Sequence, residues 1–206
     1  PLMPRHTIST MIGKLVKQVA RLRGSGSALP GLVVERMDHG YLKRTLEPLR
    51  EGVILVSGTN GKTTTTKVVT EVLQAVGYKV FTNRTGSNFS RGVISELLPL
   101  VNWRGKLDAD IAVLELDEAW AVHFVRQVKP RMSLFLNVMR DQLDRFGEID
   151  TAAEMLAKNA AAVTDRVVLN RDDPRVYRLR ERATAQAVYF GTTDELLALM
   201  PTDDTL

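Results

Sequence analysis

The stretch from residue 53 to residue 66, VILVSGTNGKTTTT, constrains the fold more than any other part of the sequence. Its apolar beginning, Val53 to Val56, predicts a buried strand, and the periodic apolar residues that follow Lys62 predict a helix. A short loop with two glycines connects the two elements. Strand, loop and helix in this order are typical of a phosphate-binding loop, because backbone N–H groups then point at an anion at the positive end of the helix dipole.

We expect the loop to bind the phosphates of a nucleotide. Lys62 would reach the outer phosphates, and the Thr63 hydroxyl would hold a magnesium ion. The loop is shorter than the pattern G-x-x-x-x-G-K-[ST], because Val56 stands where that pattern has its first glycine. The alternative is an ordinary glycine turn before a helix, and the flanking strand, the helix and the four threonines together argue against it. The predicted nucleotide-binding residues are Gly58, Thr59, Asn60, Gly61, Lys62, Thr63 and Thr64.

Composition excludes several classes of protein. The 206 residues contain no cysteine and three scattered histidines, so a metal in this chain should have oxygen ligands. With 44% hydrophobic residues the chain can bury a core, but no apolar run approaches the roughly 20 residues that span a bilayer. We therefore expect a cytoplasmic protein. A net charge of +4 with 6% aromatic residues does not favour a nucleic-acid partner.

Apolar runs alternate with helical patterns along the rest of the chain. Beyond residues 53–56, strands are predicted at 79–82, 111–116, 132–138, 166–170 and 187–190, with helical patterns at 62–76, 92–98 and 151–163. Strands that alternate with helices predict an α/β fold with a doubly wound, mostly parallel sheet of the P-loop type. In such sheets ligands bind at the carboxyl ends of the strands.

The first 50 residues are predicted to form a helical N-terminal segment with a linker, and residues 51–206 a domain that carries the predicted phosphate-binding loop. Residues 7–22 have the pattern of a basic amphipathic helix, with Lys14, Lys17 and Arg21 opposite the apolar residues. This helix could attach to an anionic membrane surface. Packing on the domain with a solvated basic face is the alternative that we favour, because no lipidation signal supplies a second anchor. A Gly-Ser linker and two short helices, at 31–37 and 41–49, precede the first strand.

Polar residues follow two of the predicted strands. Glu115 lies at the end of the strand at 111–116, where a carboxylate would complete the magnesium shell begun by the loop hydroxyl. For Asp117 and Glu118 a solvated loop or helix start and a role in metal or substrate binding are equally open. After the strand at 132–138, a dense polar run supplies Asn137, Asp141, Gln142 and Asp144 as candidate site residues. An aspartate before Pro174 is expected to cap a helix.

Five motifs occur together in a definite order: GTNGKTT, TNRTGSN, LELDE, LNVMRDQLDRFGE and LNRDDP. In this order they resemble the ATPase portion of the Mur ligase family, and most of all its MurT type, the synthetase-like subunit of lipid II isoglutaminyl synthase. The resemblance implies ATP and Mg²⁺ as cofactors and activation of a carboxylate of lipid II as an acyl phosphate. A glutamine amidotransferase partner of the GatD type would supply ammonia. It also implies catalytic roles for Lys62, Asn137 and Asp141, with Thr63, Glu115 and Gln142 as metal ligands.

The chain departs from the family pattern at three points. Gln142 stands where many Mur ligases have a metal-binding histidine, and Lys158 does not match the register of their modified lysine. The sequence also ends at Leu206, before the expected zinc ribbon, adenine contact and C-terminal domain, so we expect this fragment alone to be inactive. An amino-acid-adding Mur ligase, a folylpolyglutamate-synthase-like ligase and a nucleotide-binding module without catalysis stay as alternatives. The short segment before the loop favours the MurT type.

Overall fold

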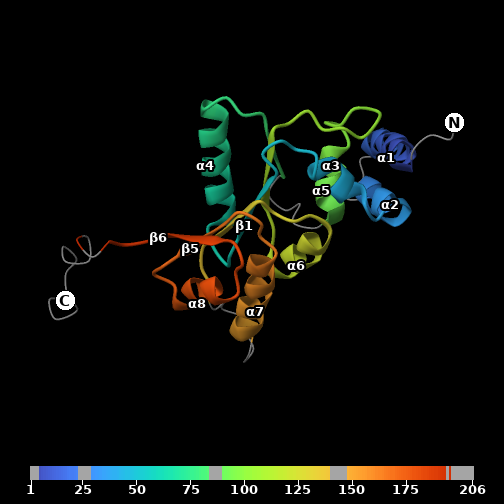
Figure 1. The fold of residues 1–206 in the computed structure, drawn as a ribbon. Helices are drawn as coiled ribbons and strands as arrows, with labels where there is room; N and C mark the ends of the chain where they lie inside the picture. The colour runs from blue at the N-terminus through green and yellow to red at the C-terminus, as the bar shows by residue number, and fades with distance from the viewer. Residues whose placement is uncertain (1–4, 23–28, 84–89, 140–147, 194, 196–206) are drawn as a thin grey trace.

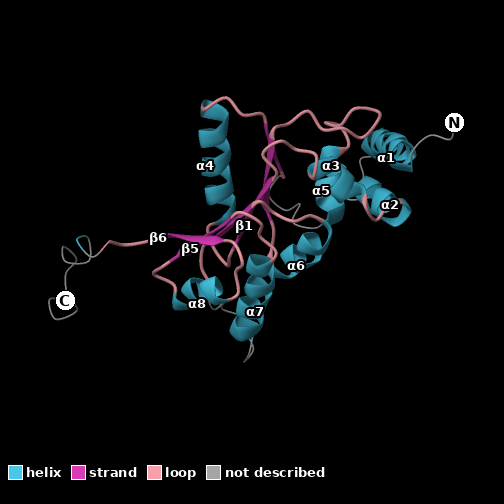
Figure 2. Ribbon diagram, viewed as in Figure 1, coloured by secondary structure: helices cyan, strands magenta, loops and turns pink. Residues whose placement is uncertain are grey.

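The computed structural model describes residues 5–22, 29–83, 90–139, 148–193 and 195 (Figure 1). Strands and helices alternate along the chain, as Figure 2 shows. The strands are β1 (Val53–Ser57), β2 (Val80–Thr82), β3 (Ile111–Glu115), β4 (Met132–Phe135), β5 (Arg166–Asn170) and β6 (Gln186–Phe190). The helices are α1 (Arg5–Leu22), α2 (Leu29–Met37), α3 (Tyr41–Leu46), α4 (Lys62–Ala75), α5 (Ser90–Leu97), α6 (Glu118–Gln127), α7 (Glu148–Ala161) and α8 (Pro174–Arg178), and α8 runs into the 3₁₀ turn η1 (Leu179–Glu181).

The six strands form one parallel sheet in the order β2-β3-β1-β4-β5-β6. The chain first moves from β1 outward to β2 and back to β3, and then crosses to the other side of β1 to add β4, β5 and β6. The strand order therefore reverses around β1, and in doubly wound sheets ligands bind at such a point. The predicted α/β fold with a parallel sheet is confirmed.

The two faces of the sheet are covered unequally. Of the described helices, α4 alone packs on one face, where Val69 and Leu73 lie against the apolar side chains of β1, β3 and β4. The other face carries α5 and α6 over β1 and β3, and α7 and α8 over β4 and β5. Figure 1 shows α4 standing on the opposite side of the strands from α6, α7 and α8.

The N-terminal helices share a core with the sheet. Tyr41, Leu42 and Leu46 of α3 are fully buried in the same cluster as Val53 and Leu55 of β1. The domain boundary predicted at residue 50 stays a prediction, and one hydrophobic core contains residues from both sides of it.

Helix α1 packs on this body through small and polar residues. A Cβ atom at position 13 would lie 2.5 Å from Cγ2 of Val34, so Gly13 lets α1 approach α2 closely. Lys14 Nζ donates to the carbonyl of Val101 at 2.6 Å, and Lys17 Nζ donates to the carbonyl of Ser95. The predicted solvated basic face is therefore wrong for these two lysines, because both contact the body. The buried residues of α1 are Ser9, Thr10, Gly13 and Ala20.

Several element boundaries differ from the sequence prediction by one to three residues, and the end of β4 matters most for the site. Strand β4 ends at Phe135 rather than at residue 138, and the residues beyond it turn toward the phosphate-binding loop. Helix α6 begins at Glu118, where the sequence left a helix start open, and it provides the crossover that a parallel connection from β3 to β4 requires. Among the described residues, none of the helices has the length and apolar character to cross a membrane.

Candidate active site

The loop between β1 and α4 has the backbone of a phosphate-binding loop. Gly58 and Gly61 have φ angles of +140° and +83°, which L side chains rarely adopt. A Cβ atom on Gly58 would also lie 3.1 Å from both N and O of Asn137, so this position needs glycine for space as well. Gly61 is the N-cap of α4, and its lack of a capping side chain leaves the first N–H groups of the helix available to an anion.

Lys62 is folded over this loop. Its Nζ donates to the carbonyl of Gly58 at 2.6 Å and of Thr59 at 3.1 Å, and lies 3.5 Å from Oδ1 of Asp117. Asp117 is the N-cap residue of α6, but its side chain makes no cap hydrogen bond. Both alternatives for Asp117 stay open, because it lies at the start of a helix and its carboxylate also faces the lysine that we expect to bind phosphates.

Thr63 and Glu115 meet in front of the loop. The Thr63 hydroxyl donates to Oε1 of Glu115 at 2.8 Å, which brings together two of the three predicted metal ligands. Glu115 is the last residue of β3 and is only 5% exposed. Asn83, just beyond β2, holds it in place, because its side chain donates to the Glu115 carbonyl at 2.8 Å and accepts from the Glu115 N–H at 2.9 Å. We had assigned no role to Asn83, although a polar residue directly after a predicted strand was a signal for one.

Asn137 braces the loop from the other side. Its Oδ1 accepts from the N–H of Asn60 at 2.8 Å, and its Nδ2 donates to the carbonyl of Asn60 at 3.0 Å. Its own carbonyl accepts from the N–H of Thr59 at 3.0 Å. These contacts hold the backbone of the loop in shape. The catalytic role predicted for Asn137 stays a prediction, and both ends of its amide are engaged with the loop.

The segment that carries Asn137 is itself held by β5 and α8. Asn170 Nδ2 donates to the carbonyl of Leu136 at 2.9 Å, and the N–H of Val138 donates to Oδ2 of Asp173 at 2.7 Å. Asp173 also accepts from the first N–H groups of α8 through Oδ1, so the predicted helix cap is confirmed. One aspartate thus connects the start of α8 to the edge of the site.

A cavity of about 300 Å³ lies between the phosphate-binding loop, the start of α4 and the end of β3. Its chemistry suits phosphates and a hard cation, since it offers helix N–H groups, one ammonium and the oxygens of Thr63 and Glu115. Among the described residues, no group of three or more His, Cys, Asp or Glu side chains is arranged so that it could hold a metal ion. The predicted residues Asp141, Gln142 and Asp144 lie outside the described residues. The cavity is lined by Thr59, Asn60, Gly61, Lys62, Thr63, Thr64, Glu115 and Asp117.

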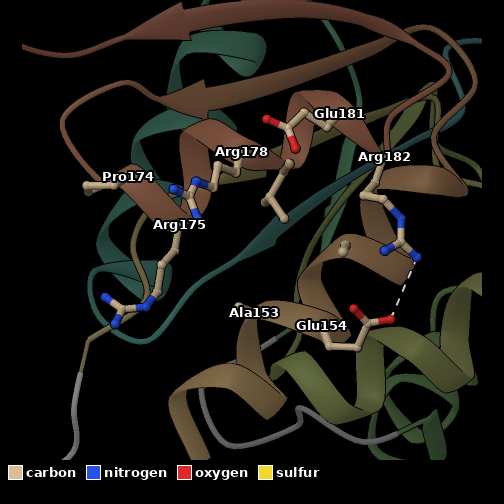
Figure 3. Close-up of a pocket in the computed structure, with 9 residues that line it drawn as sticks. Ala153, Glu154, Pro174, Arg175, Arg178, Glu181 and Arg182 are labelled. Atoms are coloured by element: carbon tan, nitrogen blue, oxygen red, sulfur yellow. Dashed lines mark ion pairs between the residues drawn. The ribbon is translucent and has the colours of Figure 1, made fainter.

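A larger cavity, of about 570 Å³, lies between α7 and α8 (Figure 3). It contains several arginines, but these do not converge on one point. Arg182 pairs with Glu154 at 3.7 Å on one side of the cavity, whereas Arg175 and Arg178 lie on the other side in Figure 3. This cavity shares none of its lining residues with the phosphate-binding loop, so we place the site at the smaller one.

The arrangement at the end of β1 agrees with a comparison against protein families. A model described as the Mur ligase middle domain matches residues 56–203. The chain belongs to the Mur ligase family. The resemblance noted in the sequence is confirmed, and the matched range includes the loop, Glu115 and Asn137.

Relatives of this Mur ligase chain include two subunits named lipid II isoglutaminyl synthase (glutamine-hydrolyzing) subunit MurT. The subunit from Staphylococcus aureus (strain COL) is 34% identical over 188 residues, which cover 91% of this chain and 42% of the relative. The one from Streptococcus pneumoniae (strain ATCC BAA-255 / R6) is 35% identical over 175 residues, covering 84% and 38%. The crystal structure of MurF ligase from Thermotoga maritima in complex with ADP has a TM-score of 0.61 at 21% identity, covering 79% and 36%. The chain spans less than half the length of these proteins.

Proposed function

We propose that this chain is the ATP-binding part of an amide-forming ligase subunit of the MurT type that acts in peptidoglycan synthesis. One observation supports this most. A Mur-type phosphate loop, in which Thr63 contacts Glu115 and Lys62 lies beside Asp117, occurs in a chain that is 34% identical to a MurT subunit over 91% of its length. The substrate would be a stem glutamate carboxylate of lipid II, and the partner a GatD-type glutamine amidotransferase in the cytoplasm.

In this proposal the residues of the site position ATP for phosphoryl transfer. The N–H groups at the start of α4 and the Lys62 ammonium would bind the β- and γ-phosphates, with Lys62 exchanging its contact to Asp117 for phosphate oxygens. Thr63 and Glu115 would hold Mg²⁺, which spreads the negative charge of the phosphates. The substrate carboxylate attacks the γ-phosphorus, the bond to the β-phosphate oxygen breaks, and ADP leaves. Ammonia then attacks the acyl carbon and displaces phosphate, which gives the amide.

A chimera tests this function, because the chain covers only part of a MurT subunit. In it, residues 1–206 replace the matched segment of the S. aureus subunit, and the chimera is mixed with a GatD-type amidotransferase, glutamine, ATP and lipid II. Mass spectrometry should find amidated lipid II, and the Lys62→Ala chimera should form none. A chimera that binds ATP but forms no amide would contradict the proposal.

The same experiment separates the alternatives. A UDP-N-acetylmuramoylalanine–D-glutamate ligase is 30% identical to this chain over 165 residues, which keeps an amino-acid-adding ligase as the second candidate. Such a ligase would join an amino acid to its substrate and would not need the amidotransferase. Nucleotide binding without any product would indicate a binding module.

A further inference from the structure

Helix α1 presents its large apolar side chains to solvent. The chain buries the small and polar face of this helix against α2 and α5, so the opposite face has no partner among the described residues. Its apolar residues are 40% to 84% exposed and recur every three or four positions, which places them in one stripe along the helix. This α1 stripe consists of Ile8, Met11, Leu15, Val19 and Leu22.

The positive charge of α1 argues against a second copy of the chain as the partner that covers the stripe. The helix contains four basic residues and no acidic one. Arg5 and Lys14 donate to the carbonyls of Met37 and Val101, which are uncharged, so these hydrogen bonds fix the two side chains without cancelling their charge. Arg21, in the last turn, is exposed. A second copy of the chain packed along the stripe would bring two such positive helices together, which disfavours a dimer through α1.

A tryptophan lies beside helix α1, next to Lys14. The ring of Trp103 is 5.2 Å from Nζ of Lys14, and its side chain is 64% exposed. Tryptophan is enriched at the boundary between lipid and water, because its ring is apolar and its N–H is polar. An apolar stripe, flanking cations and a neighbouring tryptophan are the features of helices that lie in the surface of a membrane.

We propose that the α1 stripe binds the surface of an anionic lipid bilayer, with Trp103 at the same boundary. The apolar side chains would enter the region between headgroups and acyl chains, and the exposed Arg21 would contact lipid phosphates, while the positive charges of Arg5 and Lys14 would add to the attraction. This proposal combines the two interpretations of α1 from the sequence, membrane attachment and packing on the domain. The helix packs on the domain, as the favoured interpretation required, and the face that it leaves free suits the membrane.

Vesicle co-sedimentation of the 206-residue chain tests this proposal. Vesicles of phosphatidylcholine alone are compared with vesicles that also contain phosphatidylglycerol, and no nucleotide is present, so the result does not depend on the proposed ligase activity. The chain should bind the anionic vesicles. The double variant Leu15→Gln/Val19→Gln should bind them about tenfold more weakly or worse, because it removes two side chains from the apolar contact.

The matched control changes two valines that are exposed to a similar degree on another helix. Val68 and Val72 of α4 are 53% and 58% exposed, against 63% and 42% for Leu15 and Val19. The variant Val68→Gln/Val72→Gln should bind vesicles like the parent chain. Arg21→Gln should weaken binding about fivefold on anionic vesicles and leave binding to phosphatidylcholine unchanged, because one cation near such a surface contributes about 1 kcal/mol. This exposed single variant keeps the test valid if the stripe variant does not fold.

Three results would overturn the proposal. The parent chain could fail to bind either kind of vesicle, or the stripe variant could bind as well as the parent. Sedimentation equilibrium could also show a dimer that the stripe variant converts to a monomer, which would make a second copy the occupant of the stripe.

Discussion

Replacing Asn137 by alanine separates a bracing role from a catalytic one. The change removes two hydrogen bonds to the loop, at 2.8 Å and 3.0 Å, both to the backbone of Asn60. Each such bond contributes about 0.5–1.5 kcal/mol net, so the loop conformation should lose about 1–3 kcal/mol. If only that conformation binds phosphates, the Kd for ATP should rise about 5-fold to 140-fold, since 1.4 kcal/mol is a factor of ten.

Isothermal titration calorimetry with ATP measures this change, and Asn102→Ala provides the control. Asn102 also makes two hydrogen bonds with backbone groups, since its Oδ1 accepts from the N–H groups of Arg104 and Lys106, but it lies outside the site. Both variants should lower the melting temperature by similar amounts, and only Asn137→Ala should weaken ATP binding. Equal ATP affinity in Asn137→Ala and the parent would refute the bracing role. Lost turnover with unchanged affinity would instead support the catalytic one.

Three further predictions concern the site and the partly buried His6. Lys62→Ala should weaken ATP binding about a hundredfold, because charged hydrogen bonds contribute about 1.5–3 kcal/mol each, and unchanged affinity in calorimetry would refute the phosphate-loop assignment. Glu115→Gln should weaken Mg²⁺ binding more than ATP binding; a magnesium titration identical to that of the parent would move the ligand role to Asp117. Burial lowers the pKa of His6 below its ordinary value of 6.5, against the opposing effect of the Gly105 carbonyl. The unfolded chain therefore takes up this proton first, so stability should fall as the pH drops below 6.5, and denaturant melts of His6→Gln should show less of this loss.

The strands and the phosphate loop could be predicted because their signals are local. Val53 to Val56 is an apolar run bounded by glycines, and the loop glycines occupy positions where the backbone needs positive φ. The Thr63 contact to Glu115 could also be anticipated, because both residues lie at the carboxyl edge of neighbouring parallel strands. These features need only the sequence period and the topology of a parallel sheet.

The contacts of Asn83 and Asn137 could not be predicted in the same way. The contacts of Asn83 join two strands, and the sequence does not show which strands are neighbours. Those of Asn137 depend on how far β4 continues before the chain turns, and β4 ends three residues earlier than its apolar pattern suggests. The orientation of α1 was missed for a different reason. The spacing of its apolar residues predicts a helix but does not show which side of the helix packs on the body. That side is decided by Gly13, which allows close approach, and by two lysines that donate to backbone carbonyls.

The unequal covering of the sheet has a consequence for local unfolding. Helix α4 contacts the sheet through few apolar residues, and its buried side chains are Thr66 and Thr70, whose hydroxyls have no hydrogen-bond partner among the described residues. The helix that would receive the phosphates is thus attached more weakly than α5 to α8 on the other face, and such elements open first in the native state. A ligand that binds only when α4 is packed on the sheet stabilises that packed state by its binding free energy. Nucleotide binding would therefore slow hydrogen exchange along α4 as well as at the loop itself.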